Sequence, residues 1–330
     1  MFPLFASGGN AEPLLILVAA LLVDAAIGDP PALWRRVPHP VMLIGKLIDF
    51  LDGKLNRPSR SDYDRRLRGA LVGAGMTIGA VALGLLVTAL RKATGWGWMV
   101  ELTLCWSLIA QRSLYSHVSA VAKGLDQGGL LAGRLEVAKI VGRDPASLDE
   151  HGVSRAAIES CAENFADGVV APVFWFLLFG MPGLLAYKTV NTLDSMIGHR
   201  NETYREFGMV SARLDDAMNL IPARLSGLLL SLASLFVPGG NPAKALQVML
   251  RDHGHHRSPN SGWPEAAMAG ALGLSLAGPR RYPGYVAEEQ WIGDGRSQAT
   301  AADIRSALRV MAVSCLLLLG LVLLVVLAQG

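Results

Sequence analysis

The stretch "GALVGAGMTIGAVALGLLVTAL" (Gly69–Leu90) carries no charged side chain over 22 residues. A helix needs about 20 apolar residues to cross a bilayer, so this stretch predicts a membrane-spanning helix. The composition agrees, because 52% of the residues are hydrophobic, 17% are charged and the mean hydropathy is +0.37. Average globular chains contain about 25% charged residues. We therefore expect an all-α, polytopic helical membrane protein with broken or re-entrant helices and cytoplasmic polar loops.

Further apolar runs predict full spans near residues 5–27, 97–115 and 310–328. Three other runs, near 168–198, 218–237 and 264–278, predict partial or re-entrant segments. The first of these is interrupted by "GMPG" (Gly180–Gly183), and the second has Pro222 at its start. Proline and glycine break helices, and irregular backbone at membrane depth has to be covered by protein or line a cavity. All of these segments are assigned to one integral membrane domain, 1–330.

The basic residues predict an orientation. The segment 35–68 contains nine Lys and Arg residues against four Asp and Glu, and such loops lie on the cytoplasmic side. Arg91 and Lys92 would then lie on the opposite side, which does not fit this scheme. The net charge of +3 is too small to indicate a nucleic-acid partner. The lipid bilayer is the partner that the composition predicts, and the sequence leaves the oligomeric state open.

Polar clusters border the apolar runs. "GDPPALWRRVPHP" and the helix before it contribute Asp24, Asp29 and His39. An ionisable residue such as Asp24 inside an apolar run is a functional candidate. A helix-end Asp near the membrane interface, without a functional role, is an equally good interpretation.

A second cluster is "SRAAIESCAENFADG", in which Arg155, Glu159, Glu163 and Asp167 follow one another at intervals of four. This spacing places them on one helical stripe, and three neighbouring acids repel one another unless a donor or cation lies between them. A solvated helix face is the alternative interpretation.

The stretch "YKTVNTLDSMIGHR" (Tyr187–Arg200) places Lys188, Thr192 and Ser195 on one helical face, and Tyr187, Asn191 and Asp194 on the next. Asp and hydroxyl groups beside Lys suit a phosphate or a metal ion. An interhelical hydrogen-bond network is the alternative. The following "HRNETYREFG" indicates a polar helix end closed by Gly208.

The last cluster joins "SARLDDAMNLIPARL" with "SPNSGWPEAAMAGALG". In the second string a turn precedes Glu265 in the first turn of an expected helix, and helix N-termini bind anions. No P-loop, HExxH or GxSxG motif occurs in the sequence.

Taken together, these strings resemble the CobD/CbiB family of cobalamin biosynthesis, adenosylcobinamide-phosphate synthase. The matching segments are "GDPPALWRRVPHPVMLIGKLI", "ESCAENFADGVVAPVFW", "YKTVNTLDSMIGHRNETYREFG", "SARLDDAMNLIPARL" and "SPNSGWPEAAMAGALG". They appear in the family's order and span most of the chain, from Gly28 to about Gly293. The resemblance implies an enzyme of the bacterial inner membrane that joins adenosylcobyric acid to (R)-1-amino-2-propanol O-phosphate, or to the free aminoalcohol or its ethanolamine analogue. It implies an amide-forming ligase that uses ATP and Mg²⁺, with its active site on the cytoplasmic face. Contact with other enzymes of the pathway is also expected.

Within that reaction we assign hypothetical roles, which could be exchanged among neighbours. The catalytic candidates are Glu163, Asp167, Lys188 and Asp194, with Glu163 or Asp167 taking the proton of the attacking amine. The Mg²⁺ candidates are Asp194, Asp215 and Asp216. The substrate-binding candidates are Asn164, Asn191, Thr192, Ser195, Arg213, Asn219, Arg224, Asn260 and Glu265. The secondary candidates are Asp24, Asp29, His39 and Glu159.

Two other functions fit parts of the sequence. A membrane transporter of a corrinoid or other small molecule would also have broken helices and intramembrane polar groups, but no inverted repeat is evident. A non-catalytic scaffold for corrinoid enzymes would need no carboxylate cluster.

Overall fold

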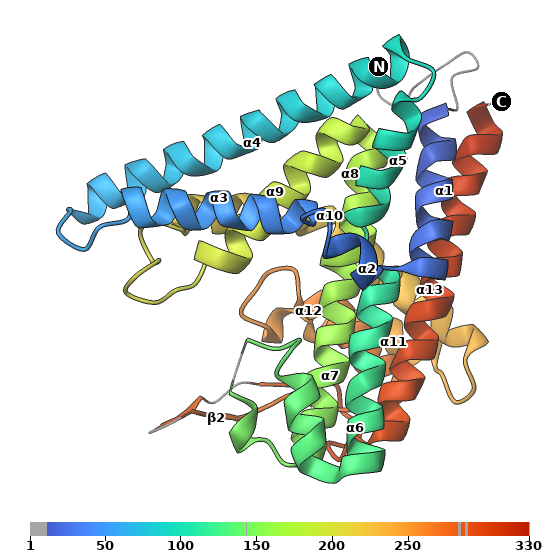
Figure 1. The fold of residues 1–330 in the computed structure, drawn as a ribbon. Helices are drawn as coiled ribbons and strands as arrows, with labels where there is room; N and C mark the ends of the chain where they lie inside the picture. The colour runs from blue at the N-terminus through green and yellow to red at the C-terminus, as the bar shows by residue number, and fades with distance from the viewer. Residues whose placement is uncertain (1–11, 143, 283–284, 288–289, 330) are drawn as a thin grey trace. The chain divides into compact units, whose positions relative to one another are not determined.

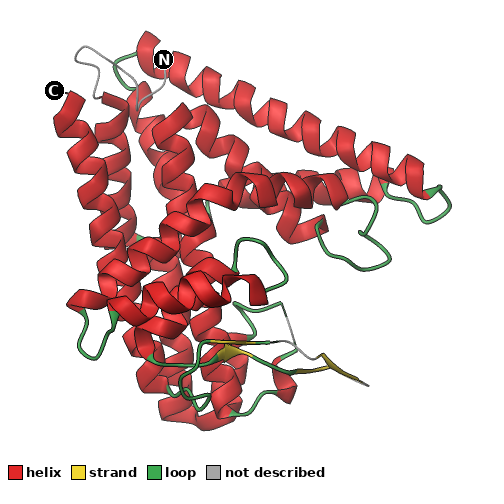
Figure 2. Cartoon of the chain, turned by 180° about the vertical axis from the view of Figure 1, so that it is seen from behind, coloured by secondary structure: helices red, strands yellow, loops and turns green. Residues whose placement is uncertain are grey.

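The structure is a computed structural model that describes residues 12–142, 144–282, 285–287 and 290–329. Most of the described residues are helical (Figures 1 and 2), so the expected all-α class is confirmed. The sequence did not predict the four short strands that occur among the described residues. Strand β1 (Leu276–Ala277) pairs antiparallel with β4 (Trp291–Ile292), and β2 (Arg280–Tyr282) pairs antiparallel with β3 (Tyr285–Ala287).

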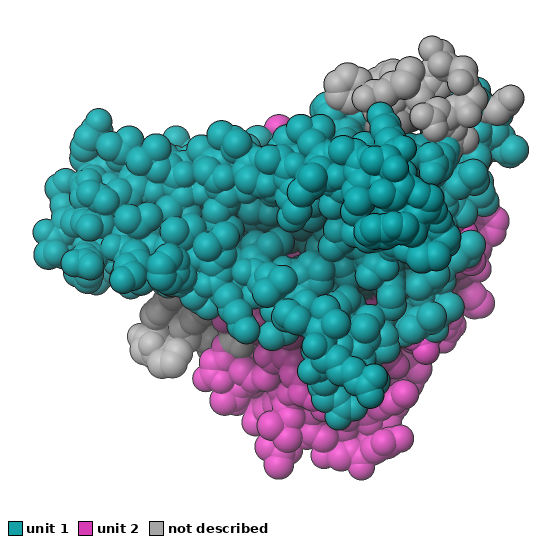
Figure 3. All heavy atoms as spheres, turned by 45° about the horizontal axis from the view of Figure 1, so that its top comes forward, with its two compact units in different colours: residues 1–110, 171–219, 322–330 teal, residues 111–170, 220–321 magenta. Residues whose placement is uncertain are grey.

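The chain divides into two compact units, each built from separate segments (Figure 3). Unit 1 comprises residues 1–110, 171–219 and 322–330. Its helices are α1 (Glu12–Ile27), α2 (Pro31–Trp34), α3 (Pro40–Leu55), α4 (Asp62–Ala93), α5 (Gly97–Ser107), α8 (Ala171–Phe179) and α9 (Met181–Ile197).

Unit 2 comprises residues 111–170 and 220–321. Its helices are α6 (Gln111–Val137), α7 (Glu150–Phe165), α11 (Pro242–Asp252) and α12 (Gly262–Leu272), with a π-helical turn at Ala166–Val170 and short 3₁₀ turns at Pro145–Ser147, Ser234–Phe236 and His253–His255. Two of the four boundaries between the units fall inside α10 (Met209–Ala233) and α13 (Ala301–Gln329), and the other two fall at the starts of α6 and α8.

In unit 1, helix α4 lies directly against α9. A Cβ atom built on Gly84 of α4 would lie 2.4 Å from the Cα of Pro182, so only glycine allows this approach. Small residues permit close helix contact in apolar surroundings. Nearer the start of α4, an apolar core of Ile48, Val72, Leu193, Ile197 and Phe207 joins α3, α4 and α9 to the segment that follows α9.

In unit 2, helix α11 packs beside α12, and its last residue, Asp252, fastens it to the chain after β4. The Asp252 carboxylate accepts hydrogen bonds from Nε of Arg251 at 2.6 Å and from the backbone N–H of Gly293 at 2.8 Å. Hydrogen bonding by Arg251, aided by the Gly293 N–H, lowers the pKa of Asp252 from its ordinary value. The carboxylate therefore stabilises this link only when it is ionised.

The expected break at Gly180–Gly183 is present. Helix α8 ends at Phe179, and Gly180 adopts a positive φ of 64° before α9 begins at Met181. A non-glycine residue is strained at this φ, so the glycine is what lets the chain turn here.

Helix α10 continues through Pro222, although the sequence placed this proline at the start of a segment. Proline has no N–H, so the carbonyl of Met218 loses its usual helical donor. The indole Nε1 of Trp175 donates to that carbonyl at 3.1 Å instead. The side-chain donor replaces the missing backbone donor, and the helix is not interrupted.

Within the part of the chain that the structure describes, four helical segments are long and apolar enough to cross a membrane: Asp62–Ala93, Glu150–Phe179, Met209–Phe236 and Ala301–Gln329. The first and last contain the expected full spans 69–90 and 310–328. The middle two contain runs that we interpreted as partial segments, and each is longer than expected because a polar helix precedes the apolar run without a break.

Two expected segments differ from the structure, and a third lies partly outside the described residues. The run 97–115 is not one span, because α5 ends at Ser107 and α6 begins at Gln111, with the buried Leu108 and Ile109 in the turn between them. The run 264–278 forms α12 only as far as Leu272, where Gly273 ends the helix in the left-handed conformation. Of the run 5–27, residues 5–11 lie outside the described residues, and α1 covers the rest.

The polar segment after α9 is not a helix end closed by Gly208. Helix α9 ends at Ile197, and residues 198–208 form no helix, with turns from 202 to 208. A Cβ atom on Gly208 would lie 1.6 Å from the carbonyl oxygen of Ile197, so the glycine is required by this close approach.

Arg91, which did not fit the predicted orientation, is buried near the end of α4. It forms ion pairs with Glu101 at 2.7 Å and with Glu12, and its side chain is only 3% exposed. This cation is therefore neutralised within the protein and does not present a free charge on that side.

We predict that Gly84→Ala lowers the free energy of unfolding by about 1–3 kcal/mol, because the new methyl group meets backbone atoms that cannot move aside. The matched control is Gly79→Ala on the same helix, where a Cβ atom meets nothing within 4 Å. The measurement is the thermal unfolding midpoint in detergent. Equal midpoints for the two variants would contradict the described packing of α4 on α9.

The lowered pKa of Asp252 predicts a pH dependence. A carboxyl group with a depressed folded-state pKa contributes stability above its unfolded pKa of about 3.9, and this contribution is lost as the pH falls through the folded-state value. Wild-type protein should therefore lose stability below about pH 4 more steeply than Asp252→Asn, whose amide does not titrate. Unfolding midpoints between neutral and acidic pH measure this difference, and parallel curves for the two proteins would refute it.

Candidate functional site

A buried chain of polar side chains connects α9 with α10 in unit 1. The Tyr187 hydroxyl donates to Oδ1 of Asn219 at 3.0 Å, and Nδ2 of Asn219 donates to Oδ2 of Asp215 at 3.0 Å. The other carboxylate oxygen of Asp215 accepts from Nδ2 of Asn191 at 3.3 Å. Tyr187, Asn219 and Asp215 are 0%, 1% and 7% exposed. Each oxygen of this buried carboxylate therefore has an amide donor.

The chain follows from helical spacing on both elements. Tyr187 and Asn191 are four residues apart on α9, and Asp215 and Asn219 are four residues apart on α10, so each pair lies on one face. Where the two faces meet, the four side chains interlock. The sequence placed Tyr187 and Asn191 on a common face, but Tyr187 was not among the candidate site residues.

Charged groups surround this chain. The positive charge of Lys188 stabilises the ionised carboxylate of Asp215, whereas the negative charge of the neighbouring Asp216 destabilises it. Asp216 is half-buried, and the cation of Arg200 acts favourably on it. Arg213 is exposed on α10, one turn before Asp216. The cluster therefore combines carboxylates, which can bind a metal ion, with cations, which can bind phosphate.

The remaining candidates on α9 interact with their own helix. The hydroxyl of Thr192 donates to the carbonyl of Lys188 at 2.6 Å, and that of Ser195 donates to the carbonyl of Asn191 at 2.9 Å. The half-buried Asp194 lies against Gly198, where a Cβ atom would come within 2.0 Å of Oδ1. Asn191 is the α9 candidate whose amide donates to the Asp215 carboxylate, as described above.

The carboxylates fit one type of Mg²⁺ site. Among the residues that the structure describes, no three His, Cys, Asp or Glu side chains lie close enough together to hold a metal ion. Asp194, Asp215 and Asp216 thus do not form a three-carboxylate group. Mg²⁺ commonly binds through one or two carboxylates together with water and substrate phosphate, and Asp215 and Asp216 provide oxygen ligands suited to that arrangement.

Asp29 and His39 form a smaller group after α1. Nε2 of His39 lies 3.5 Å from Oδ1 of Asp29, and Nδ1 of His39 accepts from the backbone N–H of Val41 at the start of α3. The ring also packs edge-on against Trp34 at 4.5 Å between centroids. Asp24, on α1, is 1% exposed. The N-cap and ring contacts show that His39 helps to position the start of α3.

In unit 2, each acid of the α7 stripe has a separate environment. Oε1 of Glu159 accepts from the backbone N–H of Ala277 at 2.8 Å, and Oε1 of Glu163 accepts from the Ser261 hydroxyl at 2.8 Å. Arg155 donates to the carbonyl of Ser297 at 2.5 Å and lies over the ring of Trp291. Asp167 lies in the π-helical turn, a feature that often accompanies functional sites.

The turn before α12 supplies the hydroxyl that reaches Glu163. Oγ of Ser258 accepts from the backbone N–H of Asn260 at 3.2 Å and from that of Ser261 at 3.4 Å, which shapes the turn. Glu265 is in the first turn of α12, as expected, and its carboxylate lies 3.8 Å from His256. Ser261 was not predicted as a site residue, and nothing in its local sequence indicated the partner on α7.

Two candidates make contacts that indicate a positioning role. The guanidinium of Arg224 lies 4.4 Å from the ring centroid of Trp263, whose other recorded ring contact is His253 at 3.9 Å. Nδ2 of Asn164 donates to the carbonyl and the hydroxyl of Ser160 on its own helix. The candidate residues are thus distributed over the two units, with Asn191, Asp215 and Asn219 in contact in unit 1 and Glu163 bound to Ser261 in unit 2.

Comparison with known proteins identifies the family. A family model described as "CobD/Cbib protein" matches residues 17–311. The chain belongs to the CobD/CbiB family. This confirms the resemblance seen in the polar strings. The match covers both polar groups described above.

Curated relatives of the CobD/CbiB family cover nearly the whole chain. "Cobalamin biosynthesis protein CobD" from Sinorhizobium sp is 54% identical over 314 residues, which is 94% of this chain and 97% of that protein. Proteins of the same name from Rhizobium meliloti and Rhodobacter capsulatus are 51% and 49% identical, over 93% and 89% of this chain and 94% and 91% of their own lengths. No solved structure matches the chain.

We predict that Tyr187→Phe lowers the free energy of unfolding by about 1–3 kcal/mol, because Oδ1 of Asn219 loses its donor in a buried position. Tyr63→Phe is the control, since Tyr63 is 75% exposed. Thermal unfolding in detergent provides the measurement. If the two phenylalanine variants melt at the same temperature, the hydroxyl does not support the buried chain.

Proposed function

We propose that the protein acts in cobalamin biosynthesis by forming an amide bond between adenosylcobyric acid and (R)-1-amino-2-propanol O-phosphate, the free aminoalcohol or its ethanolamine analogue. The observation that carries the proposal is the family match over residues 17–311, which includes the Tyr187–Asn219–Asp215–Asn191 chain. The printed names of the relatives support the pathway. The specific reaction follows from the resemblance of the polar strings to adenosylcobinamide-phosphate synthase.

The reaction requires a carboxylate of the corrinoid to be activated, since a carboxylate and an amine do not condense readily in water. The family resemblance implies ATP for this step, but the sequence contains no P-loop, and we assign no residue to the nucleotide. Bound Mg²⁺ would neutralise phosphate charge, and Asp215 and Asp216 are the residues that we propose to hold it.

The residues of the chain would act on the two substrates as follows. The amine must lose a proton when it attacks, and Glu163, held by the Ser261 hydroxyl, is the base that we propose, with Asp167 as its neighbour in the π-helical turn. Lys188 and Arg213 would bind phosphate oxygens. Both groups of the Asn219 amide are used within the protein, so we propose Asn219 as a positioning residue for Asp215 rather than a direct ligand of the corrinoid.

We further propose that the enzyme lies in the bacterial inner membrane with this chemistry on the cytoplasmic face. The four helices that are long and apolar enough to cross a membrane support an integral membrane protein. The basic segment 35–68 supports the orientation.

The direct test is product mass. Purified protein with adenosylcobyric acid, the aminoalcohol phosphate and MgATP should yield the conjugate, and omission of ATP tests the need for the nucleotide. Glu163→Gln should reduce turnover by about 10²–10⁴-fold, the usual contribution of a positioned acid–base group. Asp215→Asn should also reduce turnover, because a carboxylate ligand of the proposed Mg²⁺ is lost. Glu150→Gln is the control, because Glu150 is exposed on the same helix as Glu163.

Two outcomes would contradict the proposal. Normal turnover in both folded site variants would exclude these residues. Absence of a conjugate, combined with corrinoid counterflow into vesicles, would favour a transporter instead.

A further inference from the structure

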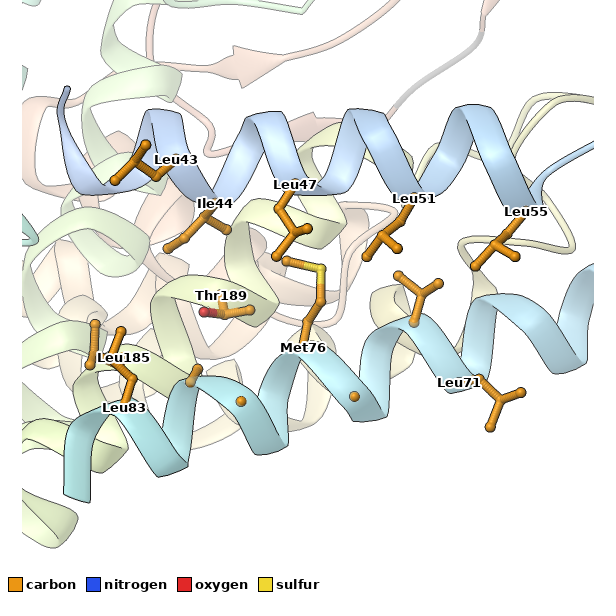
Figure 4. Close-up of a pocket in the computed structure, with 14 residues that line it drawn as sticks. Leu43, Ile44, Leu47, Leu51, Leu55, Leu71, Met76, Leu83, Leu185 and Thr189 are labelled. Carbon is orange, nitrogen blue, oxygen red and sulfur yellow. The ribbon is translucent and has the colours of Figure 1, made fainter. Parts of the chain in front are cut away.

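An open apolar groove lies between helices α3 and α4 in unit 1, with α9 as its floor. Its volume is about 670 Å³, within the ~300–1,000 Å³ typical of ligand sites. Figure 4 shows Leu47 and Leu51 of α3 and Met76 of α4 directed into the space between the two helices. Thr189, on α9, carries the one polar side chain among the 14 lining residues.

The groove stays open for two reasons. Helix α3 packs mainly on α9, since the buried Ile48 belongs to the core that contains Leu193 and Ile197 of α9, to which α4 contributes Val72. On α4, Gly75 and Gly79 line the groove, and a Cβ atom on either would meet nothing within 4 Å. The space is therefore larger than the packing of the helices requires, and larger side chains could fill it.

The connection between α3 and α4, at the end of the groove marked by Leu55, is basic. Residues 54–68 contain six Lys and Arg against two Asp. Four of the cations have acceptors within the protein: Arg60, Arg65, Arg66 and Arg68. Arg57 is exposed and forms no ion pair with any described residue, and the recorded contact of Lys54 is the ring of Phe50 at 5.8 Å. Two cations thus remain available beside the apolar groove.

We propose that this groove holds an acyl chain of an anionic phospholipid whose phosphate lies against Lys54 and Arg57. The groove extends along α3 from Leu43 to Leu55, which at 1.5 Å per residue is about 18 Å. One leaflet of a bilayer has a hydrocarbon depth of about 15 Å, half of the ~30 Å core. Clusters of Lys and Arg beside a spanning helix attract anionic lipids, and α4 is such a helix.

Other occupants fit less well. A corrinoid carries many amides, which need polar partners that this lining does not supply. A second copy of the chain could also cover the apolar surface, and the test below distinguishes it from a lipid by the oligomeric mass. The charge at the end of the groove therefore favours the anionic lipid.

The first arm of the test fills the groove. Native mass spectrometry of the purified full-length protein would be performed with added dipalmitoyl phosphatidylglycerol. Gly75→Leu/Gly79→Leu should reduce lipid binding at least about tenfold, because the acyl methylenes lose their apolar site. Gly320→Leu is the matched control: it adds the same side chain on α13, where a Cβ atom also meets nothing within 4 Å. Unchanged unfolding midpoints confirm that the variants are folded.

The second arm tests the headgroup with the groove intact. Wild-type protein should bind phosphatidylglycerol in preference to phosphatidylcholine with the same acyl chains. Lys54→Gln/Arg57→Gln should lower the ratio of phosphatidylglycerol to phosphatidylcholine binding about tenfold or more. Added salt should lower the ratio measured for wild-type protein. Lys92→Gln, at the opposite end of α4, should leave it unchanged.

Three results would overturn the proposal. The first is undiminished lipid binding by Gly75→Leu/Gly79→Leu, and the second is equal binding of both headgroups by wild-type protein. The third is a change in the oligomeric mass of Gly75→Leu/Gly79→Leu without loss of lipid, which would identify a second copy as the occupant.

Discussion

A buried carboxylate needs hydrogen-bond donors wherever it lies in an apolar protein, and Asp215 imposes this requirement on unit 1. An unpaired buried charge would cost several kcal/mol, so α9 and α10 must meet with Asn191 and Asn219 opposite the two carboxylate oxygens. The amide of Asn219 in turn needs the Tyr187 hydroxyl. The contact of the two helices is thereby specified by polar groups rather than by apolar volume alone.

Unit 2 meets the same requirement with donors from distant parts of the chain. Glu159 and Glu163 are one helical turn apart, yet one is satisfied by a backbone N–H beside β1 and the other by a hydroxyl before α12. Because each acid has its own donor, the repulsion between them is reduced. Strand β1 and the turn before α12 thus place hydrogen-bond donors beside the carboxylates of α7.

The sequence predicted what depends on local spacing. The helical class, the break at Gly180 and the common face of Tyr187 and Asn191 all follow from apolar length, backbone freedom or the 3.6-residue period. It did not predict the partner of Glu163, because Ser261 is 98 residues away and no pattern within either segment refers to the other. The turn after α5 was also missed, since Leu108 and Ile109 are apolar and read as a continuing span.

The effect of Pro222 was also mispredicted because of a distant residue. Proline usually interrupts a helix, but here a side chain from another helix supplies the missing hydrogen-bond donor. The Trp175 indole accounts for the Met218 carbonyl that the proline leaves without a partner. This dependence runs in one direction only. A chain with a backbone N–H at position 222 loses little by having tryptophan at 175, whereas a chain with proline at 222 and no donor at 175 exposes a carbonyl to apolar surroundings. Along a line of descent, tryptophan is thus the permissive substitution, and proline becomes acceptable only after it; once both are in place, the tryptophan can no longer be exchanged freely.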